Sequence, residues 1–326
     1  MRVFVAGATG AIGRHLVPKL AADGHEVVGM TRSPGKEDLI RHLGASPVVA
    51  DALDPEAVAE AVATAEPEVV IHQLTAIDAV SMTRSIDKAF TLTNRLRTEG
   101  LDHLLAAAHA VGAKRFIAQS FAGWPFERTG GPVKTEEDPL QERPPKSVSQ
   151  TLRAIRRLEE TVTRAEGIEG IALRYGGFYG PDTSLSIEPD GEHIELIRKR
   201  RLPIVGDGGG IWSFVHIDDA AAATAAALDR GTPGVYNVVD DEPAPVRVWL
   251  PELAKIIGAK PPRRIPRWVG RVLAGEGMTI MMTEVRGASN AKAKRELEWE
   301  PGYPSWRLGF RDGLKPPDRT PVGSIA

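Results

Sequence analysis

The stretch that decides the fold is Gly7-Ala8-Thr9-Gly10-Ala11-Ile12-Gly13, close to the amino terminus. It follows an apolar run, Arg2–Ala6, that predicts a β-strand, and it opens an amphipathic stretch, Ile12–Ala22, that predicts a helix. In such a unit the first glycine allows a tight turn, the second lets the backbone approach a pyrophosphate, and the third lets the helix pack on the strand. Three spaced glycines alone are a weak signal, so their place between strand and helix carries the prediction of a dinucleotide site. A glycine-rich turn without a ligand is the alternative.

Short apolar runs alternate with amphipathic stretches over the first half of the chain. Further strands are expected at 26–30, 47–50, 68–72, 115–119 and 168–174, and helices at 36–43, 55–64, 87–111 and 152–165. Alternation of this kind, with strands apolar on both faces, is typical of a parallel sheet covered by helices on both sides. We therefore expect an α/β fold, a Rossmann-type doubly wound parallel sheet with a smaller carboxy-terminal α/β substrate-binding region.

The alternation of predicted strands and helices stops after Arg174, which predicts that a second, smaller region begins there. We expect a dinucleotide-binding domain over 1–178, completed by the two strands within 211–240, and a substrate-binding region formed by 179–210 and 241–326. Helices of that region are expected at 244–257, 266–273 and 291–297. The long loop Gly123–Pro145, rich in Pro and Glu, is expected to act as a lid.

Composition narrows the class of protein. The 326 residues are 42% hydrophobic and 26% charged, with a formal net charge of −2 and no cysteine. There is thus no disulfide, thiol nucleophile or cysteine-ligated metal, and the histidines show no metal-ligand spacing. The net charge predicts no nucleic-acid or membrane partner, and no apolar run approaches a membrane span. We expect a cytoplasmic protein with a small-molecule substrate. The run Arg198–Arg201 is either a solvated helix end or a clamp for an anionic substrate.

The end of the second strand indicates which dinucleotide is bound. An acid at this point usually binds the ribose 2′-hydroxyl of NAD(H), whereas an arginine nearby suits the 2′-phosphate of NADP(H). Here the strand ends in Gly29-Met30-Thr31-Arg32-Ser33, with no acid and one arginine. NADP(H) is therefore favoured over NAD(H), with Arg32 as the phosphate ligand and Ser33 adding a hydroxyl. The alternative is that Arg32 is a solvated surface cation.

The order of motifs along the chain resembles that of the extended short-chain dehydrogenase/reductases, also called NAD-dependent epimerase/dehydratases. Besides the glycine run, the resemblance rests on Val49–Asp51, Val69–Leu74, Asn94 and Thr98, Arg115–Ser120, Glu136–Pro139, Leu173–Pro181 and Ser213–Asp219. It implies that Asp51 binds the adenine amino group, that Gln73–Thr75 flank the nicotinamide-side ribose, and that Tyr175 and Gly176 border the nicotinamide. Alternatively, Asp51 caps its loop and Tyr175 is a core residue. The expected cofactor-binding residues are Gly7, Thr9, Gly10, Ala11, Ile12, Gly13, Arg32, Asp51, Ala52, Gln73, Leu74, Thr75, Ser120, Tyr175 and Gly176.

The chain departs from the family pattern where that pattern carries proton transfer. Members normally use a Ser or Thr after the fifth strand and a Tyr-x-x-x-Lys pair on the next helix, whose lysine lowers the pKa of the tyrosine. None of the four tyrosines here is followed four residues later by lysine, and matching the helices puts Thr151 and Ile155 at those two positions. Phe121 stands at the serine position. Tyr175 is our first candidate for a replacement proton donor, Ser120 the second and Thr151 the third.

Three functions compete. The first is an NADP(H)-dependent oxidoreductase, an atypical short-chain reductase acting on a small, partly apolar carbonyl or unsaturated compound. The second is a non-enzymatic NADP-binding sensor or scaffold. The third, a sugar-nucleotide epimerase or dehydratase, is disfavoured because its chemistry depends most on the missing tyrosine. The resemblance also raises a homodimer through the helices at 87–111 and 152–165, although the charged outer face of the latter would require salt bridges rather than an apolar seam.

Overall fold

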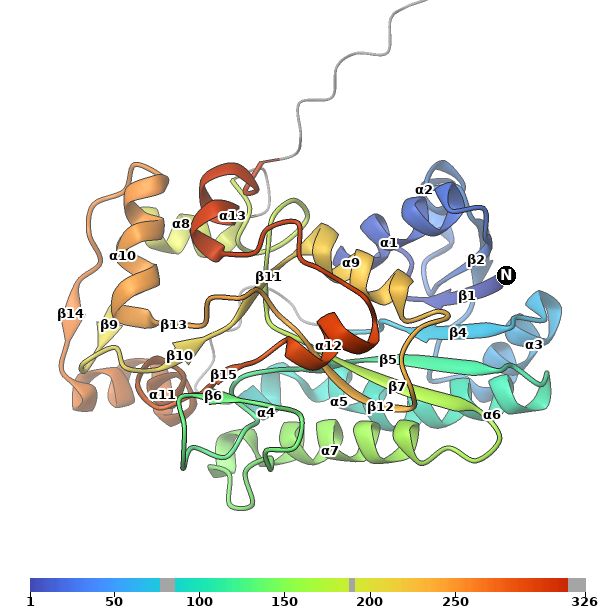
Figure 1. Cartoon of the computed structure of the whole chain (residues 1–326), viewed down its shortest axis with the longest axis horizontal. Coiled ribbons are helices and arrows are strands. Elements are labelled where there is room, and N and C mark those ends of the chain that lie inside the picture. Colours follow the sequence, from blue (N-terminus) through green and yellow to red (C-terminus); the bar gives the residue numbers. More distant parts are fainter. Residues whose placement is uncertain (77–85, 188–190, 316–326) are drawn as a thin grey trace, which may run out of the picture.

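A seven-stranded parallel sheet forms the centre of the structure (Figure 1), a computed structural model that describes residues 1–76, 86–187 and 191–315. Its strands lie in the order β12-β7-β5-β4-β1-β2-β3, and every neighbouring pair is parallel. Their bounds are β1 Arg2–Ala6, β2 Glu26–Thr31, β3 Ser46–Val49, β4 Val69–His72, β5 Arg115–Phe121, β7 Glu169–Tyr175 and β12 Gly234–Val238. The order reverses between β1 and β4, and such a reversal creates a crevice at the carboxyl ends of the strands.

Helices cover both faces of this sheet, which confirms the predicted Rossmann-type α/β fold. One face carries α1 (Ala11–Ala22), α2 (Glu37–His42) and α9 (Ile217–Ala226), packed on one apolar core. The other carries α3 (Pro55–Ala65), α6 (Leu101–Ala110) and α7 (Ser149–Thr163), packed on a second. Since helices bury both sides, the strands must be apolar on both, as in the fully buried β4.

The helix predicted over 87–111 is wrong as one continuous element. The structure divides it into α4 (Ile86–Ala89), α5 (Thr91–Arg95), a π-helical turn at Leu96–Gly100, and α6. A π turn inserts a residue into the α-helical hydrogen-bond pattern and rotates the side chains that follow. Here the turn contains Arg97, which is fully buried. The apolar periodicity of the stretch carries no signal of this insertion.

Short elements build a smaller region around a third apolar core. Its helices are α8 (Glu192–Arg198), α10 (Val246–Ile256), α11 (Arg267–Thr283) and α13 (Trp306–Asp312). Two-residue strands pair as β9 (Ile204–Val205) with β14 (Arg264–Ile265) and as β10 (Ile211–Trp212) with β13 (Ala244–Pro245). The three-residue β11 (Phe214–His216) pairs with β8 (Gly177–Tyr179), so of the two late strands expected within 211–240, β12 lies in the central sheet and β11 outside it.

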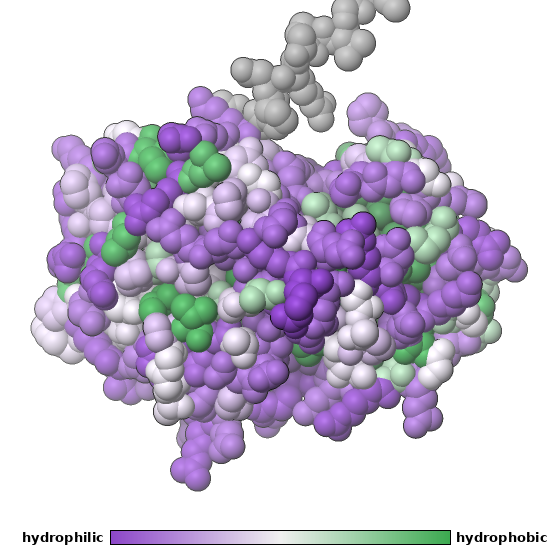
Figure 2. Space-filling view, viewed as in Figure 1, coloured by the Kyte–Doolittle hydropathy of each residue, from purple (hydrophilic) through white to green (hydrophobic). Residues whose placement is uncertain are grey.

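The remaining elements lie around this frame. They are the short helices η1 (Pro34–Lys36), η3 (Lys146–Val148) and α12 (Ala291–Glu296), and the paired strands β6 (Val133–Lys134) and β15 (Gly287–Ala288). The pairing of β6 with β15 ties the expected lid loop to the smaller region. The face seen in Figure 2 is mainly hydrophilic, with small separate groups of hydrophobic residues. Within the described ranges no helix is long and apolar enough to cross a membrane.

Candidate functional site

The glycine run forms a tight loop between β1 and α1. Gly7 has φ +97°, and a Cβ there would lie 2.9 Å from the backbone of Gln73. A Cβ on Gly13 would lie 2.3 Å from the carbonyl oxygen of Gly7, so only glycine lets α1 approach the loop this closely. At Gly10 a Cβ would meet one atom, the Gly7 oxygen at 3.3 Å, and otherwise open space. The loop is therefore closed toward the protein and open on the Gly10 side, where a phosphate could approach.

The first turn of α1 faces this opening. The first N–H groups of a helix have no partner within the helix, and the helix dipole places partial positive charge there. No acidic residue lies in the first turn of α1 to compete for those groups. This is the arrangement that binds pyrophosphates at helix N-termini. Arg14 points elsewhere, because its guanidinium binds Asp182 at 2.7 Å.

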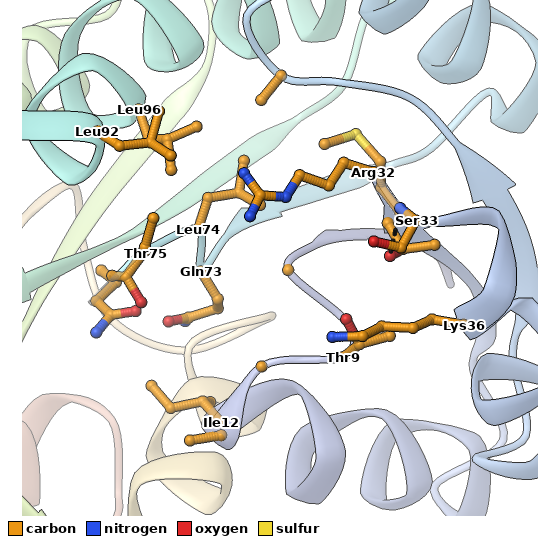
Figure 3. Close-up of a pocket in the computed structure, with 18 of the residues that line it drawn as sticks. Thr9, Ile12, Arg32, Ser33, Lys36, Gln73, Leu74, Thr75, Leu92 and Leu96 are labelled. Atoms are coloured by element: carbon orange, nitrogen blue, oxygen red, sulfur yellow. Dashed lines mark hydrogen bonds between the residues drawn. The ribbon is translucent and has the colours of Figure 1, made fainter. Parts of the chain in front are cut away.

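A cavity of about 660 Å³ extends from this loop in both directions along the carboxyl edge of the sheet (Figure 3). Its volume falls in the range of ligand pockets. The strand order shows that one end of the cavity lies beside β2 and β3 and the other beside β4 and β5. On the β2/β3 side it is lined by Met30, Thr31, Arg32, Ser33, Lys36, Ala50, Asp51, Ala52 and Leu53. On the β4/β5 side it is lined by Gln73, Leu74, Thr75, Ala76, Leu92, Leu96, Gln119, Phe178, Asp182, Thr183, Ser184 and His193.

Two cations define the β2/β3 end. Figure 3 shows Arg32 and Lys36 pointing into the cavity, with Ser33 beside Arg32 and Thr9 next to the Lys36 ammonium. Asp51 also lies there, and its carboxylate accepts the N–H of Leu53 at 3.0 Å. Asp51 therefore caps its loop and lines the cavity at the same time. Two cations and one carboxylate therefore line this end of the cavity, and all three side chains are exposed to solvent.

Gln73 supplies an unmet hydrogen-bond acceptor in the middle of the cavity. Its side chain is 5% exposed, and its Nε2 donates to the Tyr175 hydroxyl at 3.1 Å, while its Oε1 is buried and has no hydrogen-bond partner among the described residues. A buried acceptor left unpaired costs free energy of about 1–3 kcal/mol. A ligand that brings a hydroxyl donor, such as the ribose of a dinucleotide, would satisfy it. The glycine cradle and this orphaned oxygen fit a nicotinamide coenzyme.

The structure brings most of the expected cofactor residues into one cavity. Those that line it are Gly7, Thr9, Gly10, Ala11, Ile12, Arg32, Asp51, Ala52, Gln73, Leu74 and Thr75. Gly13, Ser120, Tyr175 and Gly176 lie outside its lining. Sequence reasoning missed Lys36 and His193. Lys36 could have been found as a second cation four residues after Arg32, whereas His193 comes from the smaller region and carries no local signal.

Tyr175 lies in the core behind Gln73 and outside the lining of the cavity, and its expected contact with the nicotinamide stays a prediction. The side chain is fully buried, and its hydroxyl lies 2.7 Å from Thr224 Oγ1 and 3.1 Å from Gln73 Nε2. Burial raises the pKa of Tyr175 to about 12, because the phenolate would lose its hydration. Gln73 lies between this hydroxyl and the cavity.

The other two candidate donors are also engaged in the interior. Ser120 donates to Glu159 at 2.6 Å, and Glu159 forms a two-point ion pair with Arg174 through contacts of 2.7 and 2.6 Å. Thr151 donates to Asp87 through both its hydroxyl and its backbone N–H, each at 2.8 Å. Both hydroxyls therefore hold α7 in place. Neither residue lines the cavity.

His193 is the remaining titratable group at the β4/β5 end that has no ion pair among the described residues. Asp182, its neighbour there, binds Arg14 and His15. The His193 Nδ1 lies 2.7 Å from Ser184 Oγ, and burial lowers the pKa of this histidine. It is thus a neutral hydrogen-bonding group near neutral pH. The described ranges contain no group of three or more His, Asp or Glu side chains that could hold a metal ion.

Comparison with known proteins agrees with this geometry. The model of the NAD dependent epimerase/dehydratase family matches residues 3–238. The 3-diazoavenalumate denitrifying reductase of a Streptomyces species is 44% identical over 311 residues, which cover 95% of this chain and 99% of that protein. A 2-alkyl-3-oxoalkanoate reductase from Stenotrophomonas maltophilia is 27% identical over 79% of this chain and 76% of its own length.

Solved structures show the same fold. UDP-glucose 4-epimerase from Thermotoga maritima superposes with a TM-score of 0.75 at 22% identity, covering 96% of this chain and 97% of that one. A human epimerase family protein determined with NADPH gives a TM-score of 0.74 at 19% identity, covering 96% of this chain and 99% of that one. The reductases among the relatives place the protein with the NAD(P)-dependent oxidoreductases. Its glycine cradle, its sheet and a family match over more than two hundred consecutive residues show that the chain belongs to the NAD dependent epimerase/dehydratase family.

Proposed function

We propose that the protein is an NADPH-dependent reductase that transfers a hydride to a small, partly apolar and strongly electrophilic acceptor. The observation that carries this proposal is the cavity itself, which joins a phosphate cradle and two cations at one end to a partly apolar wall at the other, where the Asp182 carboxylate is paired with Arg14 and His15. A nicotinamide coenzyme, when bound, supplies the hydride. Arg32 and Lys36 would hold its 2′-phosphate, and Gln73 would accept a hydrogen bond from its ribose.

The proposed type of acceptor follows from the lack of the proton donor that is usual in this family. In the family the tyrosine supplies a proton to the substrate oxygen, and losing a general acid typically costs about 10²–10⁴-fold in rate. Here the sequence has no Tyr-x-x-x-Lys pair, and Tyr175, Ser120 and Thr151 are all engaged in interior hydrogen bonds. An acceptor whose reduction needs no proton from the protein is therefore the best match to this site.

An aryl diazonium compound meets that requirement. The Streptomyces relative carries the name of a reductase that removes nitrogen from a diazo acid, and it is similar over nearly the whole of both chains. In the reduction of a diazonium group, the hydride brings the electron pair of the new bond, the carbon–nitrogen bond breaks, and its electrons leave with N₂. The sum is R–N₂⁺ + H⁻ → R–H + N₂, which balances without a proton.

The β4/β5 end of the cavity has groups suited to orient such an acceptor. Phe178 offers an aromatic face, and Gln119, Ser184 and His193 offer neutral hydrogen-bonding groups. The lowered pKa of His193 keeps it uncharged near neutral pH, so it does not repel a cationic acceptor. We expect His193→Ala to raise the KM for the acceptor while the Kd for NADPH stays the same.

Turnover with two acceptor classes tests the proposal. Purified protein would be given NADPH and either an aryl diazonium carboxylate or a panel of aromatic and aliphatic carbonyl compounds, beside reactions without protein. Deuterium placed at C4 of the nicotinamide should appear at the carbon that carried nitrogen, with release of N₂. Deuterium transfer to carbonyl carbon alone would keep the reductase and exclude the diazo acceptor.

No NADPH oxidation above the protein-free reaction with either class, combined with tight NADPH binding, would favour the sensor or scaffold. Epimerase activity on a sugar nucleotide would contradict the proposal. The structural likeness to epimerases does not favour that activity, since at this identity it reflects the shared fold.

A further inference from the structure

The outer face of α11 exposes large hydrophobic side chains. Trp268 is 71% exposed, Val272 61% and Leu273 66%, and these are three of the seven exposed large hydrophobic residues among those the structure describes. The opposite face of the helix is seated on β9, because a Cβ on Gly270 would lie 2.5 Å from the Val205 side chain. Trp268 and Val272, four residues apart, therefore point together toward solvent.

A cluster of cations surrounds this face. Between Glu252 and Glu276 the chain has six basic residues and no acidic one: Lys255, Lys260, Arg263, Arg264, Arg267 and Arg271. The run Arg198–Arg201 lies beside them, because β9 begins three residues after it and pairs with β14, and because Arg200 Nε donates to the Pro261 carbonyl at 3.0 Å. Figure 1 shows β9, β14 and α11 together at the end of the molecule remote from β1 and β2.

Few carboxylates balance these ten cations. Glu195, Glu276 and Glu284 pair with four of them. Counting Asp207 and Glu252 from the same segments still leaves ten cations against five carboxylates. Six cations have no ion pair among the described residues: Lys255, Lys260, Arg200, Arg201, Arg263 and Arg264. The overall charge of −2 conceals this local excess.

We propose that this basic apolar face, formed by α11, β14 and Arg198–Arg201, docks on the surface of an anionic lipid bilayer. A helix that lies in a membrane interface presents Trp and aliphatic side chains to the acyl boundary, with Arg and Lys beside them reaching the headgroups. Phosphate charges alone would account for the cations and leave three exposed apolar side chains without a role. A bilayer accounts for both. This inference is independent of the proposed function.

The position of the face agrees with peripheral contact. Helix α11 bends at Gly275, where φ is +85°, so Trp268, Val272 and Leu273 all lie in its first half. The second half packs inward, and a Cβ on Gly277 would lie 3.4 Å from Val148 Cγ1. The first half can therefore lie along a membrane while the second half keeps its contacts with η3. The smaller region would face the lipid, with the sheet behind it.

Vesicle flotation of the full chain tests the proposal. Vesicles would be made of phosphatidylcholine alone or mixed with phosphatidylglycerol, an anionic lipid. We expect binding to the anionic vesicles only, weakened by high salt. Arg263→Glu/Arg264→Glu and Trp268→Ser/Leu273→Ser should each weaken it about tenfold or more. The charge control is Lys114→Glu/Arg153→Glu, two exposed cations on other helices and loops, which should bind as the wild type does.

Lipid-attached bromine should quench tryptophan fluorescence in the wild type and much less in Trp268→Phe, which places that side chain in the bilayer. Circular dichroism confirms that each variant is folded. Three results would overturn the proposal: no binding to anionic vesicles, equal loss in patch and control variants, or binding of soluble polyanions without vesicles. Self-association that the patch variants abolish, with no lipid binding, would instead assign the face to a second copy of the chain.

Discussion

Removing the two cations at the β2/β3 end of the cavity should abolish a preference for NADPH. Arg32 and Lys36 are exposed side chains that line the cavity, so water and salt partly screen their contacts with a 2′-phosphate. Charge-assisted hydrogen bonds contribute about 1.5–3 kcal/mol in sheltered sites. We take about 1.4 kcal/mol for each exposed contact, which is about tenfold in Kd. Each alanine variant should weaken NADPH binding about tenfold, and the double variant about a hundredfold.

Titration of NADPH and NADH by nucleotide fluorescence measures this directly. The Kd for NADH should hardly change in any variant, because NADH lacks the phosphate that the cations bind. The Kd for NADH divided by the Kd for NADPH should also fall as salt is raised, because salt screens the contacts with the 2′-phosphate. Arg41→Ala is the matched control, since Arg41 is an exposed arginine on α2 that binds Glu37 and Asp38 and does not line the cavity.

Two results would refute this reasoning. Equal affinities of the wild type for NADPH and NADH would mean that Arg32 and Lys36 are solvated surface cations. An unchanged affinity ratio in the double variant would mean that a phosphate preference, if measured, comes from other groups. A loss of NADH and NADPH affinity in parallel would show damage to the loop rather than loss of a specific contact.

Three further predictions concern the interior. Tyr175→Phe should lower the free energy of unfolding by about 1–3 kcal/mol, since it leaves Gln73 Nε2 without its partner, whereas Thr224 Oγ1 keeps its bond to the Ala220 carbonyl; kcat should change less than about threefold, and a large kcat loss at unchanged stability would restore Tyr175 to the chemistry. Gly13→Ala should weaken NADPH binding by about tenfold or more, because the added Cβ meets the Gly7 oxygen. The control Gly131→Ala should leave NADPH binding unchanged, because only one atom lies near its Cβ, at 3.8 Å. Equal affinities of the two variants for NADPH would show that α1 can shift freely. Burial raises the pKa of Asp240 from 3.8 to about 8, so between these pH values the folded protein holds a proton that the unfolded chain releases. The free energy of unfolding measured in urea should therefore fall as pH rises through this window. The same dependence of stability on pH in Asp240→Asn would contradict this reasoning.

The positions of the backbone elements and the phosphate cradle follow closely from local sequence. Strands such as Val69–His72 must be apolar on both faces because helices cover both sides of a parallel sheet. Gly7 and Gly13 are required by contacts with their own loop and with the neighbouring strand end, so the spacing of glycines already contains the geometry. Arg32 is found in the same way, since the end of β2 always lies beside this loop.

The orientation of individual side chains could not be predicted from the sequence. Tyr175 is the last residue of a strand, and such a residue points either into the helix layer or toward the crevice. Its hydroxyl contacts Thr224 on α9, so the side chain of Tyr175 points into the helix layer. Likewise His193 reaches the cavity only because the smaller region folds back over the carboxyl edge of the sheet.

By itself, then, the amino-acid sequence determined the doubly wound sheet, the glycine cradle and the cation at the end of β2, because each depends on neighbours within a few residues or on the burial of whole strands. Tertiary structure alone decided which hydroxyls are free, which residues form the β4/β5 end of the cavity, and that Arg198–Arg201 lies beside α11. The physical reason is that hydrogen-bond partners and charge clusters arise between segments far apart in the chain. Residues such as Ser120 and Glu159, 39 positions apart, meet only after the sheet and its helices have packed.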